Sequence, residues 1–123
     1  MRFKIDTKEK IMIFRPEIKV LDANLSEEFI REISELPELN GRNLILDMAL
    51  VESADEAGIQ AILTVYGLQY DSNLSCAITN VNNTLTAALS QDSDYELNIT
   101  PTLSEAIDMV MMESLERDLL DEE

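Results

Sequence analysis

Short apolar runs along the chain alternate with longer segments in which apolar residues recur every three or four positions. The runs FKID at residues 3–6 and IMIF at 11–14 flank TKEK, a pattern typical of two strands joined by a turn. NLILDM at 43–48 is almost continuously apolar, which indicates a strand buried on both faces. SCAITNV at 75–81 and the alternating YELNIT at 95–100 predict the remaining two strands.

Helical spacing follows most of these strands. We predict four helices, at residues 24–36, around Ile59 to Tyr66, at 83–90 and at 100–120. Thr102 precedes Glu105 by three residues, which is the spacing of a capping box at the start of the last helix. Strands that alternate with helices favour a largely parallel sheet covered by helices. We therefore expect an α/β fold with a mostly parallel, mixed five-stranded sheet and about four helices.

The last helix carries several methionines. Whether their side chains are buried or exposed depends on the width of the buried face of the helix. Its core stripe consists of Leu103, Ala106, Ile107 and Val110. We expect Met111 and Leu115 to extend this stripe. Met109 and Met112 fall beside it, so they form either a wide core face or an exposed contact surface, and we favour the core.

With 123 residues the chain fits one domain, with a core at about 2–112 and a C-terminal helix that ends in an acidic tail at 113–123. No signal peptide or apolar run long enough to span a bilayer is recognisable, which favours a cytoplasmic protein without membrane insertion. The lone Cys76 agrees with a reducing compartment, and its apolar surroundings predict a buried thiol.

The net charge of −16 is unevenly distributed, because residues 1–19 hold six of the nine basic residues. The acidic remainder makes nucleic acid an unlikely partner and disfavours an anionic membrane. A basic protein partner is favoured by charge complementarity, although the acidity can also serve solubility alone.

Several kinds of catalytic site are disfavoured because the chain does not contain the residues that they need. The chain has no histidine, which weakens histidine-based catalysis and ordinary zinc sites, and its three glycines cannot form a phosphate-binding loop. Asp22, Asp47, Asp55 and Glu56 could converge at one edge of the sheet and hold a hard cation. We favour a simpler interpretation, in which Asp55 caps the second helix, Glu56 lies in its first turn and no cofactor is bound.

Three separated motifs resemble the STAS domain of bacterial anti-sigma-factor antagonists, over roughly residues 2–112. The first is NLILDMALVESADEAGIQAIL, in which Asp47 matches a strand-end Asp, while Asp55 and Gly58 match the ends of an Asp-Ser-Ser-Gly motif. The others are LDA at 21–23, which contains Asp22, and ITPTLSEAIDMV at 99–110. Glu56 stands where the family has a phosphorylatable Ser, and Ala57 replaces the second Ser.

The resemblance implies a non-catalytic protein–protein interaction module in bacterial transcription regulation. In the family, phosphorylation of the motif Ser releases the antagonist from an anti-sigma kinase, and DEAG in place of DSSG cannot be switched in this way. Ser53 lies nearby, at a position that is usually apolar in the family, and we do not expect it to replace the acceptor. The resemblance assigns partner binding or switching to Asp22, Asp47, Asp55, Glu56, Ala57 and Gly58.

Three functions follow, with different partners. The first is binding to an anti-sigma factor kinase or another protein of a sigma-factor circuit. The second is a fixed STAS subunit of a larger assembly, such as a lipid-transport complex or a stressosome-like scaffold. The third and weakest is a Mg²⁺-dependent nucleotide binder, because the chain lacks a general-base histidine and phosphate-binding glycines.

Overall fold

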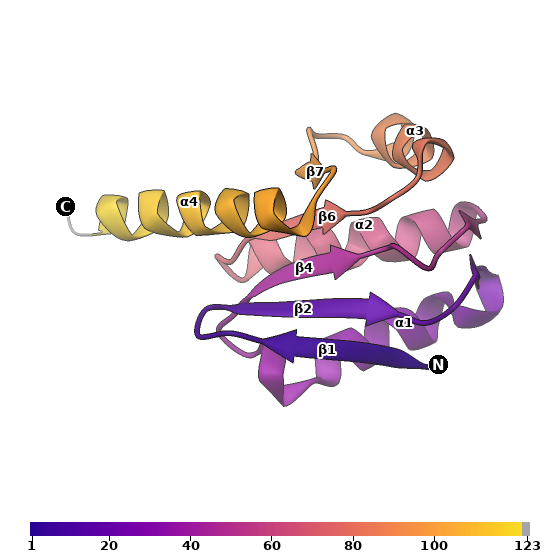
Figure 1. Cartoon of the computed structure of the whole chain (residues 1–123), viewed down its shortest axis with the longest axis horizontal. Coiled ribbons are helices and arrows are strands. Elements are labelled where there is room, and N and C mark those ends of the chain that lie inside the picture. The colour runs from indigo at the N-terminus through magenta and orange to yellow at the C-terminus, as the bar shows by residue number, and fades with distance from the viewer. Residues whose placement is uncertain (122–123) are drawn as a thin grey trace.

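The main sheet has five strands in the order β1-β2-β4-β6-β7 (Figure 1). The computed structural model describes residues 1–121, in which these strands are β1 (Phe3–Thr7), β2 (Ile11–Pro16), β4 (Asn43–Asp47), β6 (Cys76–Thr79) and β7 (Ile99–Thr100). β1 pairs antiparallel with β2, and the other neighbours pair in parallel. The predicted mixed, mostly parallel sheet is therefore confirmed.

Within residues 1–121 the four predicted α-helices are present, together with a 3-10 helix, η1. Their bounds are α1 (Ala23–Glu35), η1 (Pro37–Leu39), α2 (Glu56–Asp71), α3 (Asn83–Asp92) and α4 (Leu103–Asp121). The predicted acidic tail at 113–123 is helical as far as Asp121, and residues 122–123 lie outside the described residues. No helix of the described part is both long and apolar enough to cross a membrane.

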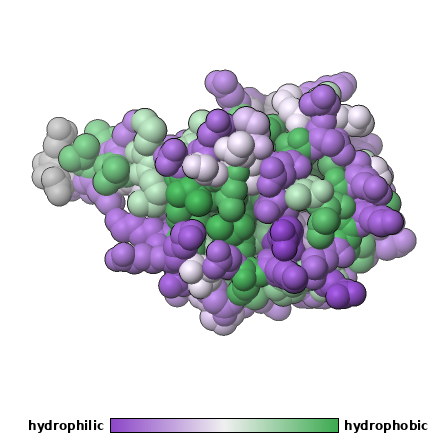
Figure 2. Space-filling view, viewed as in Figure 1, coloured by the Kyte–Doolittle hydropathy of each residue, from purple (hydrophilic) through white to green (hydrophobic). Residues whose placement is uncertain are grey.

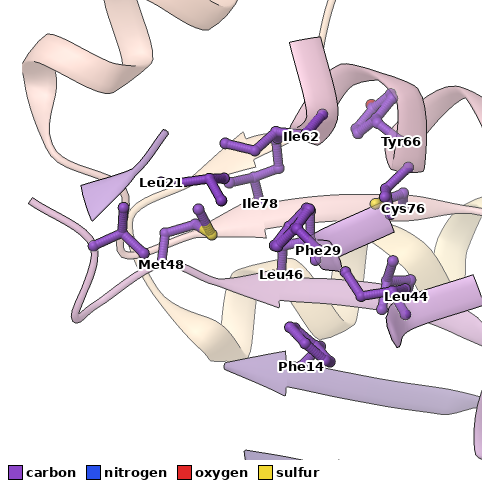
Figure 3. Close-up of a cluster of buried hydrophobic side chains, with 14 of the residues drawn as sticks. Phe14, Leu21, Phe29, Leu44, Leu46, Met48, Ile62, Tyr66, Cys76 and Ile78 are labelled. Atoms are coloured by element: carbon purple, nitrogen blue, oxygen red, sulfur yellow. The ribbon is translucent and has the colours of Figure 1, made fainter. Parts of the chain in front are cut away.

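The inner strands β2, β4 and β6 are buried on both faces because neighbouring side chains pack against different helices. In β4, Leu44 and Leu46 join the larger core with α1 and α2, whereas Ile45 between them joins a smaller core with α4. Figure 3 shows side chains of the inner strands meeting those of α1 and α2 in the larger core. The rings of Phe14 and Phe29 lie edge to face there, with their centroids 6.0 Å apart. This two-sided burial explains the continuous apolar run that predicted the strand.

A second, very short sheet brings two connections of the chain together. β3 (Val20–Leu21) lies just before α1, and β5 (Ser53–Ala54) lies just before α2. The two strands pair in parallel. Each strand has only two residues, so hydrophobic periodicity in the sequence cannot reveal it. Their pairing places the beginnings of α1 and α2 side by side.

The prediction of a strand over the whole of 95–100 was wrong, because only its last two residues form β7. Leu97 packs against the larger core and the ring of Tyr95 stacks on that of Tyr66. The alternating pattern therefore marks an extended segment with one side facing inward. The backbone N–H of Asn98 donates to the Tyr66 hydroxyl at 2.9 Å instead of to a neighbouring strand.

The outer half of α4 also differs from the prediction. Met111 packs against the smaller core as expected, but Leu115 is 56% exposed and Met112 is 62% exposed. The core interpretation was therefore wrong for Leu115, Met109 and Met112, all of which are exposed. Met109 and Met112 lie on the outer side of α4, around the buried Val110. Leu115 is exposed because α4 continues past the end of the sheet (Figure 1), and Figure 2 shows hydrophobic residues on its projecting end.

Candidate functional site

Asp55 closes the N-terminus of α2, as the sequence predicts. Its Oδ1 accepts the backbone N–H of Gly58 at 2.9 Å. Its Oδ2 accepts the backbone N–H of Ala23, the first residue of α1, at 3.0 Å. One carboxylate therefore satisfies a free N–H at the start of two helices, where each helix dipole concentrates about half a positive charge.

Asp22 caps α1 from the other side of the same corner. Its Oδ1 accepts the backbone N–H of Asn24 at 3.0 Å, and its carbonyl oxygen accepts the hydroxyl of Ser26 at 2.9 Å. Since Asp55 bonds to Ala23, which directly follows Asp22 in the chain, the structure brings the two acids together. Both carboxylates serve helix N-termini.

Gly58 is required by the close approach of α2 to β3. A Cβ atom at this position would lie 2.0 Å from the carbonyl oxygen of Leu21 and 3.1 Å from the Cβ of Ala54. Real Cβ atoms do not approach backbone oxygens this closely, so any larger residue would push α2 away from β3. The motif glycine thus sets how tightly the first turn of α2 packs beside the start of α1.

Asp47 lies apart from this corner. It is 8% exposed at the end of β4, and its Oδ1 accepts the backbone N–H of Ala49 at 3.1 Å and the side-chain amide of Asn80 at 3.0 Å. These bonds fix the turn after β4 to the turn after β6. Among residues 1–121 no three Asp, Glu or Cys side chains are grouped so that they could hold a metal ion.

Glu56 and Ala57 are the two residues that the sequence resemblance aligned with the serines of the family motif. Glu56 is exposed at the first position of α2, and Ala57 is half-buried behind it. Within the described residues the Glu56 carboxylate takes part in no hydrogen bond and no ion pair. Its negative charge lies at the positive end of the α2 dipole, which stabilises it.

Exposed apolar side chains lie beside this first turn. Val20 is 46% exposed and pairs in register with Ser53. Leu50 is 45% exposed in the connection between β4 and β5, where it lines a hollow of about 350 Å³ together with Ile18. The same hollow is lined by Glu17, Lys19 and Glu52, so charged and apolar groups share the surface formed by the connections that lead into α1 and α2, a combination suited to protein recognition.

A second cavity, also of about 350 Å³, lies between the C-terminal half of α2, the segment before β7, and α4. Three tyrosines and three carboxylates line it: Tyr66, Tyr70, Tyr95, Asp71, Glu96 and Glu113. We call it the tyrosine cavity. Sequence analysis missed it because its residues come from three separate segments. The spacing of Tyr66 and Tyr70, four residues apart on one helix, was the one local signal.

Hydrogen bonds hold the wall of the tyrosine cavity in place. The hydroxyl of Tyr70 donates to Glu113 Oε1 at 2.7 Å, and the side-chain amide of Asn98 donates to Glu113 Oε2 at 3.0 Å. The same amide lies 2.9 Å from the Tyr70 hydroxyl oxygen, to which it can also donate. These contacts join α2, the segment before β7, and α4.

This network controls the ionisation of Glu113. Burial acts to raise the pKa of its carboxyl group, but hydrogen bonds from Tyr70, Asn98 and Ser75, together with the charge of Arg117, lower that pKa below its usual value. Glu113 is therefore negatively charged at neutral pH. Burial raises the pKa of the Tyr70 hydroxyl, which stays protonated and able to donate.

Comparison with known proteins identifies the fold. Residues 2–106 match the family model of the STAS domain. A candidate anti-sigma factor antagonist from Thermotoga maritima superposes with a TM-score of 0.77 at 22% identity, over 89% of this chain and 94% of that one. A serine-to-glutamate variant of RsbS from Moorella thermoacetica gives 0.70 at 18% identity, over 93% and 98%. A chain from the stressosome, a signal integration hub, gives 0.67 at 14% identity, over 90% and 98%. No curated protein sequence matches the chain.

Proposed function

The chain belongs to the STAS domain family, and we propose that it is a non-catalytic protein-binding module of the cytoplasm that acts in the manner of an anti-sigma-factor antagonist. Its partner is an anti-sigma factor kinase or another protein of a sigma-factor circuit. The observation that carries this proposal is the exposed Glu56 at the first position of α2, directly after the cap Asp55.

The proposed docking surface consists of Asp55, Glu56 and Ala57 with the exposed Val20 and Leu50. Its centre is a helix N-terminus with a carboxylate that has no partner in the described residues, and its apolar neighbours offer area to bury. Such a surface fits a partner that presents Lys or Arg beside apolar side chains.

We propose further that the charge of this surface is fixed. Phosphorylation of a serine adds about −1.5 to −2 charges and three acceptor oxygens at a helix N-terminus. Glu56 supplies roughly half that charge permanently, and neither Glu56 nor Ala57 has a hydroxyl that a kinase could modify. Because Ala57 has lost its hydroxyl too, we favour a partner that has adapted to Glu56 over one that is kept away by it.

The test begins with affinity capture of the partner from the source cells, identified by mass spectrometry, followed by calorimetry with Glu56→Ser. A charge-assisted hydrogen bond contributes roughly 1.5–3 kcal/mol, so an adapted partner should bind the variant about tenfold or more weakly. Tighter binding of the variant would mean instead that Glu56 acts as a permanent phosphoserine. Equal affinities would leave Glu56 as an ordinary first-turn acid and contradict both versions.

A matched control comes from the start of α4, where Glu105 is also an exposed acid in a helical first turn. Glu105→Ser removes the same charge from the same kind of position outside the docking surface. It should leave the affinity unchanged. Phosphopeptide mapping gives a second check, since stoichiometric phosphorylation of Ser53 would overturn the fixed-charge idea.

A second candidate function is a fixed subunit of a multi-protein assembly. It is favoured by the fold similarity to a stressosome chain and by the exposed apolar residues on the projecting end of α4. Light scattering on the captured complex separates the two functions. A complex with one or two copies of each protein supports the antagonist-like role, and a large complex with many copies supports the assembly.

A further inference from the structure

The tyrosine cavity is separate from the docking surface, although both involve α2. Gly58 lies in the first turn of α2 and Tyr70 near its end. Tyr70 follows Gly58 by twelve positions, which corresponds to ~18 Å at the ~1.5 Å rise per residue of an α-helix. A ligand in the tyrosine cavity would therefore not touch Glu56.

The aromatic walls of the cavity favour a cation. The centroid of the Tyr66 ring lies 5.2 Å from that of Tyr70 and 5.9 Å from that of Tyr95. Tyr66 is almost fully buried, while Tyr70 and Tyr95 are 37% and 50% exposed, so the group presents aromatic surface to the cavity. The faces of aromatic rings carry partial negative charge and attract ammonium and guanidinium groups within about 6 Å.

The carboxylates act in the same direction. Glu113 is charged and held by Tyr70 and Asn98, while Asp71 and Glu96 are exposed. None of the described residues that line the cavity is Lys or Arg. Arg117, the one base of α4, donates to the hydroxyl of Ser75, and its charge offsets part of that of Glu113. Asp71 and Glu96 take part in no ion pair within the described residues. The cavity thus keeps an excess of negative charge.

A neighbouring hollow favours a cation that belongs to a side chain of a polypeptide over a free small molecule. This hollow, of about 200 Å³, shares Tyr95 with the tyrosine cavity and is lined by two further acids, Asp92 and Asp94. Its other wall is formed by Gln60, Leu63 and Thr64 of α2. Two hollows that share one exposed tyrosine and carry separate acids fit successive basic side chains of an extended segment. A single small cation would occupy one of them and leave the other empty.

We propose that the tyrosine cavity binds the guanidinium or ammonium group of an Arg or Lys side chain carried by a basic segment of a partner protein. The guanidinium stacks on the tyrosine rings and pairs with the carboxylates, while the next basic residue of the segment meets Asp92 and Asp94. This site lies beyond the proposed function, because it uses no residue of the docking surface.

Gly67 offers a direct way to close the site. It lines the cavity, and a Cβ atom built there would point toward the Tyr95 hydroxyl at 3.4 Å. The side chain of Gly67→Leu would therefore extend into the space that the cation needs. Tyr95→Leu removes one aromatic wall from a half-exposed position, where the fold depends little on it.

The experiment is an NMR titration of the ¹⁵N-labelled full chain with a peptide of alternating Arg and Gly. The control peptide has citrulline, which is neutral and of the same shape, in place of every Arg. We expect the Arg peptide to shift the backbone amide signals of Gly67, Tyr70, Tyr95 and Asn98, and the citrulline peptide to shift none of them. Tyr95→Leu and Gly67→Leu should each weaken the binding by about fivefold or more.

Three further variants separate this site from general acidity and from the docking surface. Glu96→Gln should weaken the binding, whereas Glu35→Gln, which removes an exposed charge from the end of α1, should not. Glu56→Ser should bind the peptide as the wild type does, so the proposal survives if the proposed function fails. Thermal melting confirms that each variant is folded.

Several results would each overturn the proposal. These are equal shifts with the citrulline peptide, shifts spread over the whole acidic surface, unchanged affinity in Tyr95→Leu and Gly67→Leu, and loss of binding in Glu56→Ser. Binding of free arginine methyl ester as tightly as the peptide would indicate a small-molecule site and would also overturn it.

Discussion

The carboxylate of Asp55 accepts the backbone N–H of Ala23 at 3.0 Å and so ties the start of α2 to the start of α1, across 32 residues of sequence. The same carboxylate caps its own helix through Gly58. The first turn of α2 therefore cannot shift without breaking a bond to another helix. This coupling makes the proposed docking surface a rigid corner.

The double role of Asp55 predicts an unequal effect of two similar substitutions. Asp55→Ala removes a bond from each of two helices, whereas Asp22→Ala removes the cap of α1 alone. Loss of an N-cap costs roughly 0.5–2 kcal/mol, so we expect Asp55→Ala to lower the free energy of unfolding by about 2–3 kcal/mol and Asp22→Ala by about 1 kcal/mol. Urea unfolding followed by circular dichroism measures both, and equal losses would mean that the bond to Ala23 contributes nothing.

The two glycines of α2 should respond to alanine in opposite ways. Alanine is ordinarily about 1 kcal/mol better than glycine inside a helix. At Gly58 its Cβ would lie 2.0 Å from the Leu21 carbonyl oxygen, so we expect Gly58→Ala to destabilise the fold by about 2 kcal/mol or more. At Gly67 the nearest atom is the Tyr95 hydroxyl at 3.4 Å, and the substitution should be neutral or stabilising. Thermal melting of the pair decides, and a change of the same sign in both variants would contradict the account.

Cys76 should be inert toward thiol reagents in the folded protein. Its side chain is fully buried, and burial raises the pKa of the thiol, so very little thiolate forms at neutral pH. We expect Ellman's reagent to react only as fast as the chain opens, and to react rapidly in urea above the unfolding midpoint. A native rate within about tenfold of that of free glutathione would show that the thiol is accessible.

We expect Glu113 to contribute to the stability of the fold at neutral pH and to lose that contribution in acid. Its pKa is lower in the folded protein than the usual 4.5, so its contribution is present above that value and is lost as the pH falls below it. Glu113→Gln should therefore lose less of its melting temperature between pH 7 and pH 3 than the wild type does. The difference should be a few degrees at most, because the group is partly exposed. Glu116→Gln, on the exposed side of the same helix, should behave like the wild type.

The parts of the fold that sequence analysis predicted correctly are those with local signals. β4 is apolar at successive positions because both of its faces are covered, and Asp55 stands at the spacing from Gly58 that a helix cap requires. Leu115 shows the limit of such reasoning. Helical periodicity continues through it, but the pattern does not reveal that the sheet below has ended.

The candidate sites depend on contacts between distant segments, which no local pattern encodes. The resemblance to the family placed Asp22 and Asp55 in one motif set but not the bond from Asp55 to Ala23, and Asp47 belongs to a different turn. The tyrosine cavity likewise requires Asn98 to leave the expected strand and to bond with Glu113. These contacts follow from how the helices pack, and so they become visible only in the folded chain.

The two borders of the main sheet restrict how another protein can attach to it. β7 has only two residues, too few to template the backbone of a foreign strand. β1 is longer, but Lys4 and Asp6 alternate along it as charged gatekeepers that discourage strand addition. Assembly through an added strand from another protein is therefore disfavoured. Amyloid-like stacking is disfavoured too, because it also begins with a foreign strand that pairs with an edge of the sheet. Recognition of this protein must rely on side chains and helix ends, which evolution can vary without changing the sheet.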